Sequence, residues 1–90
     1  MVRKRERLEV IKDILDSIRE GRRIKPTRLL YASNLSPQMF KEYIDELMKK
    51  DFIKLESDDN GKKTFILTKK GYEFLQEYRI IEDFIKNFGL

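Results

Sequence analysis

Gln38 and Lys41 lie in the first turn of a short predicted helix that begins at Ser36-Pro37. Ser36 suits the N-cap, because its hydroxyl accepts a hydrogen bond from a first-turn N–H, and Pro37 suits the first helical position. A glutamine amide can bind an adenine edge bidentately, and a lysine ammonium can reach guanine or a phosphate. The chemistry that this segment offers is therefore recognition of bases and phosphates.

Other cations and donors surround this helix start in the sequence. Ser36 and the first backbone N–H groups can hold a phosphate at the positive end of a helix. Lys25 and Arg28, one helix earlier, would contact the flanking backbone, and a later lysine pair would reach a minor groove or phosphates. We therefore predict a double-stranded DNA site made of eight residues, namely Lys25, Arg28, Ser36, Pro37, Gln38, Lys41, Lys62 and Lys63.

Composition excludes most catalytic chemistry. The 90 residues include no cysteine and no histidine, so thiolate nucleophiles, zinc sites and imidazole acid–base catalysis are absent. We expect no enzyme activity, no metal, no cofactor and no small-molecule ligand. No apolar run is long enough to span a bilayer and no signal peptide is seen, which predicts a cytoplasmic, nucleoid-associated protein with no membrane partner.

Charge is unevenly distributed along the chain. Residues 1–28 hold ten Lys or Arg against five Asp or Glu, or +5, whereas the whole chain carries +4. The remainder is therefore −1. A basic N-terminal third suits a polyanionic partner, although solvated helix faces in a Lys/Glu-rich protein would look the same.

Apolar spacing places three helices before residue 51. Residues 5–20 carry one stripe of three- and four-residue spacing, ended by Gly21 in a left-handed conformation, and Ile24 could then pair as a minor strand. A second helix begins at Pro26 and fails at Asn34. The third, 37–50, restarts almost at once. The residues expected to be buried are Leu8, Ile11, Ile14, Leu15 and Ile18, then Leu29, Leu30 and Ala32, then Phe40, Tyr43, Ile44, Leu47 and Met48.

A hairpin and a last helix complete the chain. Residues 52–56 and 64–68 read as strands, and Asn60-Gly61 between them is a strong hairpin signal. Thr68 can cap a helix over 69–87. The fold class is mainly α with a small β-hairpin (α+β), a winged helix-turn-helix with an added C-terminal helix. We expect one domain, with DNA binding in 1–68 and dimerisation in 69–90.

The runs Leu30–Ser36 and Phe40–Leu47 resemble the archaeal winged-helix predicted transcriptional regulators. That family is similar to the small archaeal winged-helix chromatin proteins, which dimerise through a C-terminal helix. The resemblance covers nearly the whole chain and implies a transcriptional regulator or chromatin-type DNA-binding protein. Asp51 stands where the family usually has Gly, so we expect the corner after the third helix to be built differently.

The last helix carries more apolar residues than one buried stripe needs. A heptad places Phe74, Tyr78, Ile81, Ile85 and Phe88 on one seam, with Tyr72, Leu75 and Phe84 beside it. We predict a homodimer with this seam as its interface. The alternative is that so small a domain needs all of these residues for its own core.

A second function also fits the pattern. Glu42 and Asp45 fall on the presumed groove face of helix 37–50, where carboxylates oppose phosphates. They favour a winged-helix protein–protein docking module that does not bind DNA. Tyr31 and Tyr43 are expected in or beside the core rather than stacked on bases.

Overall fold

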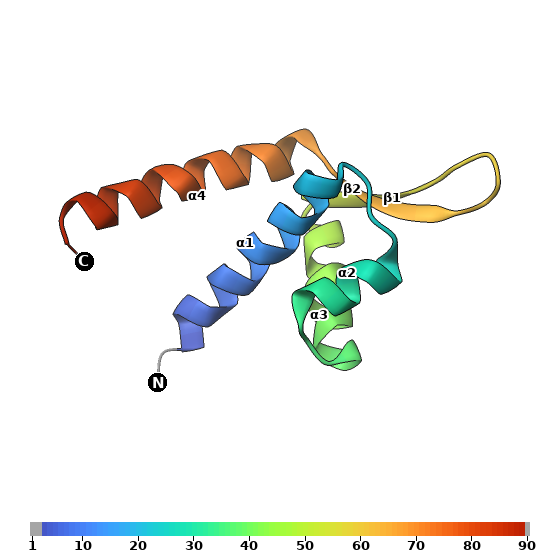
Figure 1. Ribbon diagram of the computed structural model, residues 1–90, viewed down its shortest axis with the longest axis horizontal. Coiled ribbons are helices and arrows are strands. Elements are labelled where there is room, and N and C mark those ends of the chain that lie inside the picture. The colour runs from blue at the N-terminus through green and yellow to red at the C-terminus, as the bar shows by residue number, and fades with distance from the viewer. Residues whose placement is uncertain (1–2, 90) are drawn as a thin grey trace.

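The computed structural model describes the backbone of residues 3–89 and the side chains of residues 7–89. Within these ranges the order is α1 (Arg3–Gly21), α2 (Pro26–Ser33), α3 (Pro37–Lys49), β1 (Ile53–Ser57), β2 (Lys63–Leu67) and α4 (Lys69–Asn87) (Figure 1). The predicted order and fold class are confirmed. The basic residues before position 7 have side chains outside the described part of the chain.

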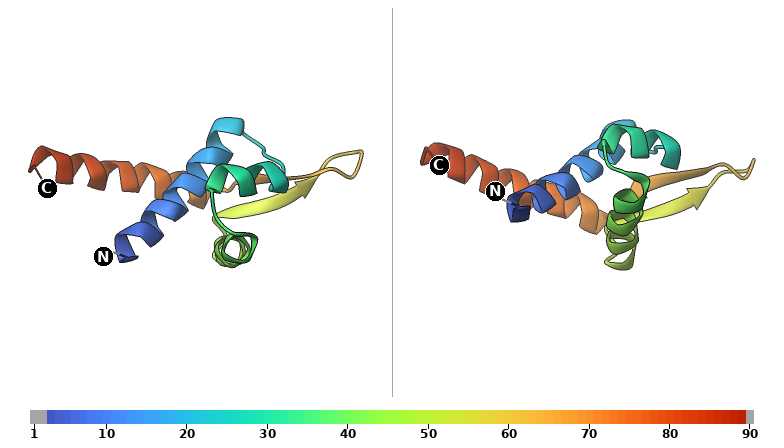
Figure 2. Two further views of the ribbon diagram at one scale, coloured as in Figure 1. Left: turned by 60° about the horizontal axis from the view of Figure 1, so that its bottom comes forward. Right: turned by 90° about the horizontal axis from the view of Figure 1, so that it is seen from below.

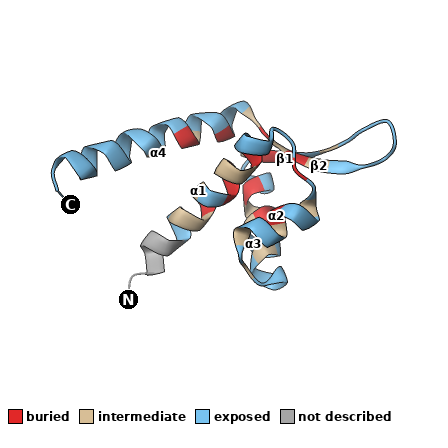
Figure 3. Ribbon diagram, viewed as in Figure 1, coloured by how far each residue is buried: buried red, intermediate tan, exposed pale blue. Residues whose placement is uncertain are grey.

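The core lies where the second half of α1 meets α2, α3, the hairpin and the first turns of α4 (Figure 3). Burying these side chains supplies the main driving force for folding. The buried residues of the core are Ile11, Ile14, Leu15, Ile18, Ile24, Leu29, Ile44, Leu47, Ile53, Phe65, Leu67 and Leu75.

Four residues predicted to be buried are not. Leu8 is 48% exposed, because the N-terminal half of α1 extends away from the other elements (Figure 1). Met48 is 40% exposed at the last turn of α3, and Ala32 is also exposed. Tyr31 is 77% exposed. It follows the buried Leu29 by two positions, which puts it on the opposite side of a helix.

Two chain reversals differ from expectation. Gly21 remains the last residue of α1, and the left-handed residue is Arg22, with φ 64°. The corner after α3 uses the left-handed conformation that glycine would adopt, since Asp51 has φ 67°. The Asp51 N–H donates to the carbonyl of Met48 at 3.0 Å, and the Phe52 N–H donates to Leu47 at 2.9 Å. These bonds satisfy the last carbonyls of α3.

The hairpin pairs antiparallel, with Ile53 opposite Leu67 and Leu55 opposite Phe65. Both strands lie within one residue of their predicted bounds. Residues 58–62 join the two strands. The Asp58 N–H donates to the Lys62 carbonyl at 2.9 Å, which leaves residues 59–61 as the loop itself, and Gly61 there has φ 82°. The Asp58 carboxylate accepts from the N–H groups of Asn60 and Lys62, at 2.8 and 2.9 Å. Asp58 therefore shapes the turn.

A single residue after α1 pairs with the hairpin. Ile24 and Phe65 exchange two backbone hydrogen bonds, at 3.1 and 2.8 Å, as an antiparallel bridge. The pairing expected of Ile24 after the first helix is seen, as a one-residue bridge rather than a strand. This bridge fixes the start of α2 against the base of the hairpin.

The hairpin and α4 extend in opposite directions from the core (Figures 1 and 2). Thr68 caps α4 as predicted, because its hydroxyl accepts from the Gly71 N–H at 3.1 Å. The molecule is elongated, with extents of 50 × 27 × 20 Å. In the described part of the chain no helix is long and apolar enough to cross a membrane.

Candidate nucleic-acid interface

The turn between α2 and α3 is held by local hydrogen bonds. Asn34 ends α2 in the left-handed conformation, with φ 58°. The Ser33 hydroxyl donates to the Leu30 carbonyl at 2.7 Å and accepts from the Leu35 N–H at 3.4 Å. Ser36 then caps α3, since its hydroxyl accepts from the Met39 N–H at 3.2 Å. The predicted cap is confirmed, and it fixes where α3 begins.

Opposite faces of α3 have opposite roles. Ile44 and Leu47 are buried, and Phe40 and Tyr43 pack against the same core. At about 100° per residue, the face opposite these side chains is a stripe of four residues. This outward stripe consists of Gln38, Glu42, Asp45 and Lys49, all exposed. Figure 2 shows α3 at the edge of the molecule, so the stripe faces away from the core.

Lys41 borders the outward stripe and is paired. Its ammonium donates to the Asp45 carboxylate at 2.8 Å. The hydrogen bond and the charge of Asp45 raise the pKa of Lys41 above its ordinary value of 10.5. Lys41 is therefore fully charged at neutral pH, and two of its three N–H donors remain available beside the bond to Asp45.

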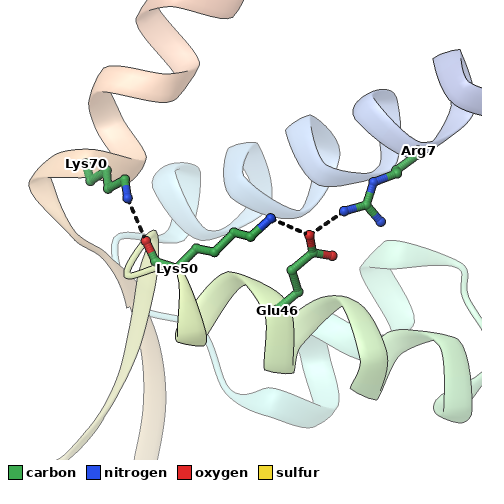
Figure 4. A network of polar contacts seen from close by, with 4 residues as sticks. All are labelled: Arg7, Glu46, Lys50 and Lys70. Carbon is green, nitrogen blue, oxygen red and sulfur yellow. Dashed lines mark hydrogen bonds and ion pairs between the residues drawn. The ribbon is translucent and has the colours of Figure 1, made fainter.

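The side of α3 that faces α1 and α4 is anchored by ionic contacts (Figure 4). Glu46 accepts hydrogen bonds from Lys50, at 2.9 Å, and from Arg7 of α1. These bonds hold the pKa of Glu46 below its ordinary value of 4.5. Lys70 of α4 donates to the Lys50 carbonyl at 3.0 Å and lies 5.0 Å from the centre of the Phe52 ring. One network thus ties α3 to both long helices.

The eight predicted site residues are all exposed, in two groups. Six belong to the helix-turn-helix: Lys25 and Arg28 on α2, and Ser36, Pro37, Gln38 and Lys41 at the start of α3. Lys62 and Lys63 lie at the far end of the hairpin, separated from α3 by the length of the wing (Figure 1). Asp58 and Asp59 share that tip and reduce its positive charge.

Tyr31 was missed as a candidate. With Leu30, it lines a shallow cavity of about 390 Å³ beside Ser36 and Pro37. An exposed tyrosine there can contact DNA through its ring and its hydroxyl. Its position relative to Leu29, half a helical turn away, is the signal that would have placed it outside the core.

A second concavity does not suit nucleic acid. It has a volume of about 1070 Å³ and lies between α1 and the α2–α3 turn. Four carboxylates of α1 line it, namely Glu9, Asp13, Asp16 and Glu20. Their charge repels a polyanion. Among the described residues, no group of acidic side chains could hold a metal ion.

Known structures share this arrangement. The DNA-binding protein Sso10a-2 of Sulfolobus solfataricus superposes with a TM-score of 0.71 at 20% identity, over 89% of this chain and 81% of that one. A putative MarR-like transcription regulator of Bacillus cereus superposes with a TM-score of 0.73 at 18% identity, over 88% of this chain and 59% of that one. A MarR family transcriptional regulator of Silicibacter pomeroyi superposes with a TM-score of 0.73 at 24% identity, over 90% of this chain and 56% of that one. At these identities the likeness establishes the fold.

Sequence comparison establishes the family. An uncharacterized protein of Methanocaldococcus jannaschii is 46% identical over 68 residues, which are 76% of this chain. The match spans 64% of that archaeal relative's length. The winged helix-turn-helix family model matches residues 4–86. The resemblance noted in the sequence is confirmed, and the chain belongs to the winged helix-turn-helix family.

Proposed function

We propose that this protein is a double-stranded DNA-binding regulator that places α3 in the major groove. The observation that carries the proposal is the exposed, capped start of α3. Gln38 and Lys41 lie near that start, and Lys25 and Arg28 belong to the helix before it. Gln38 would contact base edges. The DNA backbone would be positioned by four residues, namely Lys25, Arg28, Ser36 and Pro37. The DNA-binding and regulatory roles named for the structural neighbours support this function, which requires no catalysis or cofactor.

The wing would add a second contact. Lys62 and Lys63 would meet phosphates or a minor groove beyond the segment covered by α3. Lys25 follows Ile24, whose antiparallel bridge to Phe65 brings it beside β2, the strand that begins at Lys63, so one extended ligand could contact both groups. Such a protein would act in the cytoplasm, on nucleoid DNA.

We assign residues 1–68 to DNA binding and residues 69–90 to a homodimer interface. The alternative, that α4 needs its apolar residues for the core of its own domain, is wrong for the outer half. Ile80, Ile81, Ile85 and Phe88 are all exposed there, and Phe84 is 60% exposed. Soluble monomers rarely expose so large an apolar surface, which supports covering by a second copy.

The predicted dimer seam contains residues of two kinds. Phe74 packs edge-to-face on Phe52, with ring centres 5.5 Å apart, and Tyr78 is half-buried beside it. Ile81, Ile85 and Phe88 are more exposed. Leu8 of α1 and the seam residues from Phe74 to Ile85 line an apolar groove of about 430 Å³. The partner's last helix would cover this groove and the exposed residues beyond it.

Salt-dependent binding tests the DNA-binding function. Each neutralised phosphate contributes about −0.9 to the slope of log K against log salt, so about six contacts per dimer would reduce affinity roughly a thousandfold between 50 and 200 mM. We expect fluorescence anisotropy with a random-sequence duplex to show this slope. Arg28→Ala should flatten it by about one unit per copy. Lys86→Ala, which removes a cation from α4, is the matched control and should leave it unchanged.

Absence of binding at 50 mM salt would reject the proposal. It would favour the protein–protein docking module instead. The exposed carboxylates of Glu42 and Asp45 on α3 are the observation that supports that second candidate.

A further inference from the structure

The centre of the outward stripe is acidic. Gln38 and Lys49 are its ends, and Glu42 and Asp45 lie between them. Asp45 is paired with Lys41. Glu42 makes no hydrogen bond or ion pair within the described part of the chain. Among the described residues, Glu42 therefore offers an unpaired carboxylate at the centre of the stripe that would face the groove.

A carboxylate at this place would interact with phosphates and with bases in opposite ways. Near phosphates it is repelled, and the repulsion lowers affinity for every sequence equally. At a base edge it is an acceptor without a donor, and the major groove offers two amino donors, cytosine N4 and adenine N6. The adenine amino group lies beside the N7 acceptor, which repels a carboxylate, so cytosine is the complementary base. Its contribution is therefore favourable only where a cytosine is presented to it.

We infer, on the basis of the proposed function, that Glu42 is a specificity-determining residue that accepts a hydrogen bond from a cytosine N4 in the major groove. A sequence-independent packing protein gains affinity from each cation on its contact face and only loses it from carboxylates. The acidic centre of α3 thus favours a sequence-selective regulator over a nucleoid packer. The carboxylates repel unmatched sequences, and the Glu42 hydrogen bond favours matched ones. The difference between these two effects is the discrimination.

Asp45 has a supporting role. Its bond to Lys41, at 2.8 Å, holds that ammonium over the outward stripe before DNA binds. Any duplex offers Lys41 a phosphate, and a matched sequence also offers a guanine, while the charge of Asp45 partly neutralises the ammonium and repels phosphates in both cases. Asp45 therefore weakens binding to all duplexes, and we expect it to read no base itself.

Selection from duplexes with a randomised central segment tests the inference. The wild type should enrich sequences with a cytosine at one position, preferred about five- to tenfold over other bases. Glu42→Gln should move that preference to adenine, because an amide binds the adenine edge bidentately. Glu42→Ala should lose it. Both variants should bind random duplex at low salt about threefold more tightly, because one repulsive charge is gone.

Asp83→Asn is the matched control. It removes one exposed carboxylate from the outer half of α4, away from α3, and should alter neither the base preference nor the affinity. Circular dichroism of each variant confirms the fold. If Glu42→Gln enriches the same sequences as the wild type, the inference is wrong.

The behaviour of the wild type distinguishes failure of this inference from failure of the proposed DNA-binding function. If it binds duplex DNA but enriches no sequence, the inference is overturned and the DNA-binding function stands. Failure to bind any duplex at 50 mM salt would overturn both.

Discussion

Of the four glycines, Gly71 has the most crowded surroundings. A Cβ built at Gly71 would lie 2.3 Å from the carbonyl oxygen of Phe52 and 3.2 Å from a methyl carbon of Leu67. The first of these is backbone, which cannot move aside as a flexible side chain can. Gly71 is also the residue whose N–H donates to the Thr68 cap. The first turn of α4 therefore lies directly on the corner that follows α3.

Gly71→Ala should destabilise the protein by about 2–3 kcal/mol, because α4 must shift away from the corner to accommodate the methyl group. Urea unfolding followed by circular dichroism measures the change. Gly21→Ala is the control, since its added methyl would meet only Ile24, at 3.9 Å, inside a helix. That variant should be neutral or stabilised by up to about 1 kcal/mol. Equal effects at both positions would show that close packing at Gly71 is unimportant.

At the scale of elements, the orientation of α3 depends on contacts on its two sides. The core fixes one side through Ile44 and Leu47. The network around Glu46 fixes the other, because it joins α3 to α1 through Arg7 and to α4 through Lys70 (Figure 4). Because α3 is held by both sets of contacts, its outward stripe is presented at a defined angle to the domain.

Glu46→Gln should lower stability at pH 7 by about 0.5–1 kcal/mol, a small figure because the Glu46 side chain is 26% exposed and solvent screens the pair. The pKa of Glu46 is lowered in the folded state. Its contribution is therefore complete above the unfolded value of 4.5 and is lost as the pH falls through the folded pKa. The difference between wild type and variant should vanish in strong acid.

Urea midpoints measured from pH 7 to pH 3 check this dependence. Glu42→Gln is the matched control, because it removes a carboxylate of the same helix that has no partner among the described side chains, and it should leave the midpoints unchanged at every pH. A Glu46→Gln difference that stays constant down to pH 3 would contradict ionic anchoring.

At the scale of the whole molecule, α4 extends past the core and carries its exposed apolar residues with it (Figure 3). Two copies joined there by a two-fold axis would present two α3 helices on one side. Such a pair suits half-sites about one DNA turn apart. The proposed dimer thus turns one weak contact into two linked ones.

Ile81→Lys combined with Ile85→Lys should give a folded monomer, because both side chains are already exposed in the single chain. DNA binding should weaken by at least about tenfold, because the two sites are no longer linked. Sedimentation measures the mass and anisotropy the affinity. Gln76→Lys with Asn87→Lys adds the same charge to the polar face of α4 and should remain dimeric. A wild type that sediments as a monomer at high micromolar concentration would reject the interface.

The sequence by itself determined the elements and their order. Ser36-Pro37, Thr68 and Gly61 specify helix starts and a turn through bonds between near neighbours, so they could be located without knowledge of the fold. The same holds for the eight DNA-site candidates, whose exposure follows from polar character and helical spacing. The dimer seam and the roles of these candidates remain predictions.

Tertiary structure decided what depends on how far each helix reaches beyond its neighbours. Leu8 and Leu15 are alike in sequence pattern, yet only Leu15 is buried, because Leu15 lies in the core whereas Leu8 lines an open groove between α1 and α4. Likewise Leu75 of α4 lies in the core, whereas Phe84 is exposed. The left-handed conformation of Asp51 is likewise imposed from outside, since α3, β1 and α4 meet at that corner and the Thr68 hydroxyl donates to its carbonyl at 2.6 Å. Periodicity identifies an apolar face, but only packing determines which part of that face is covered.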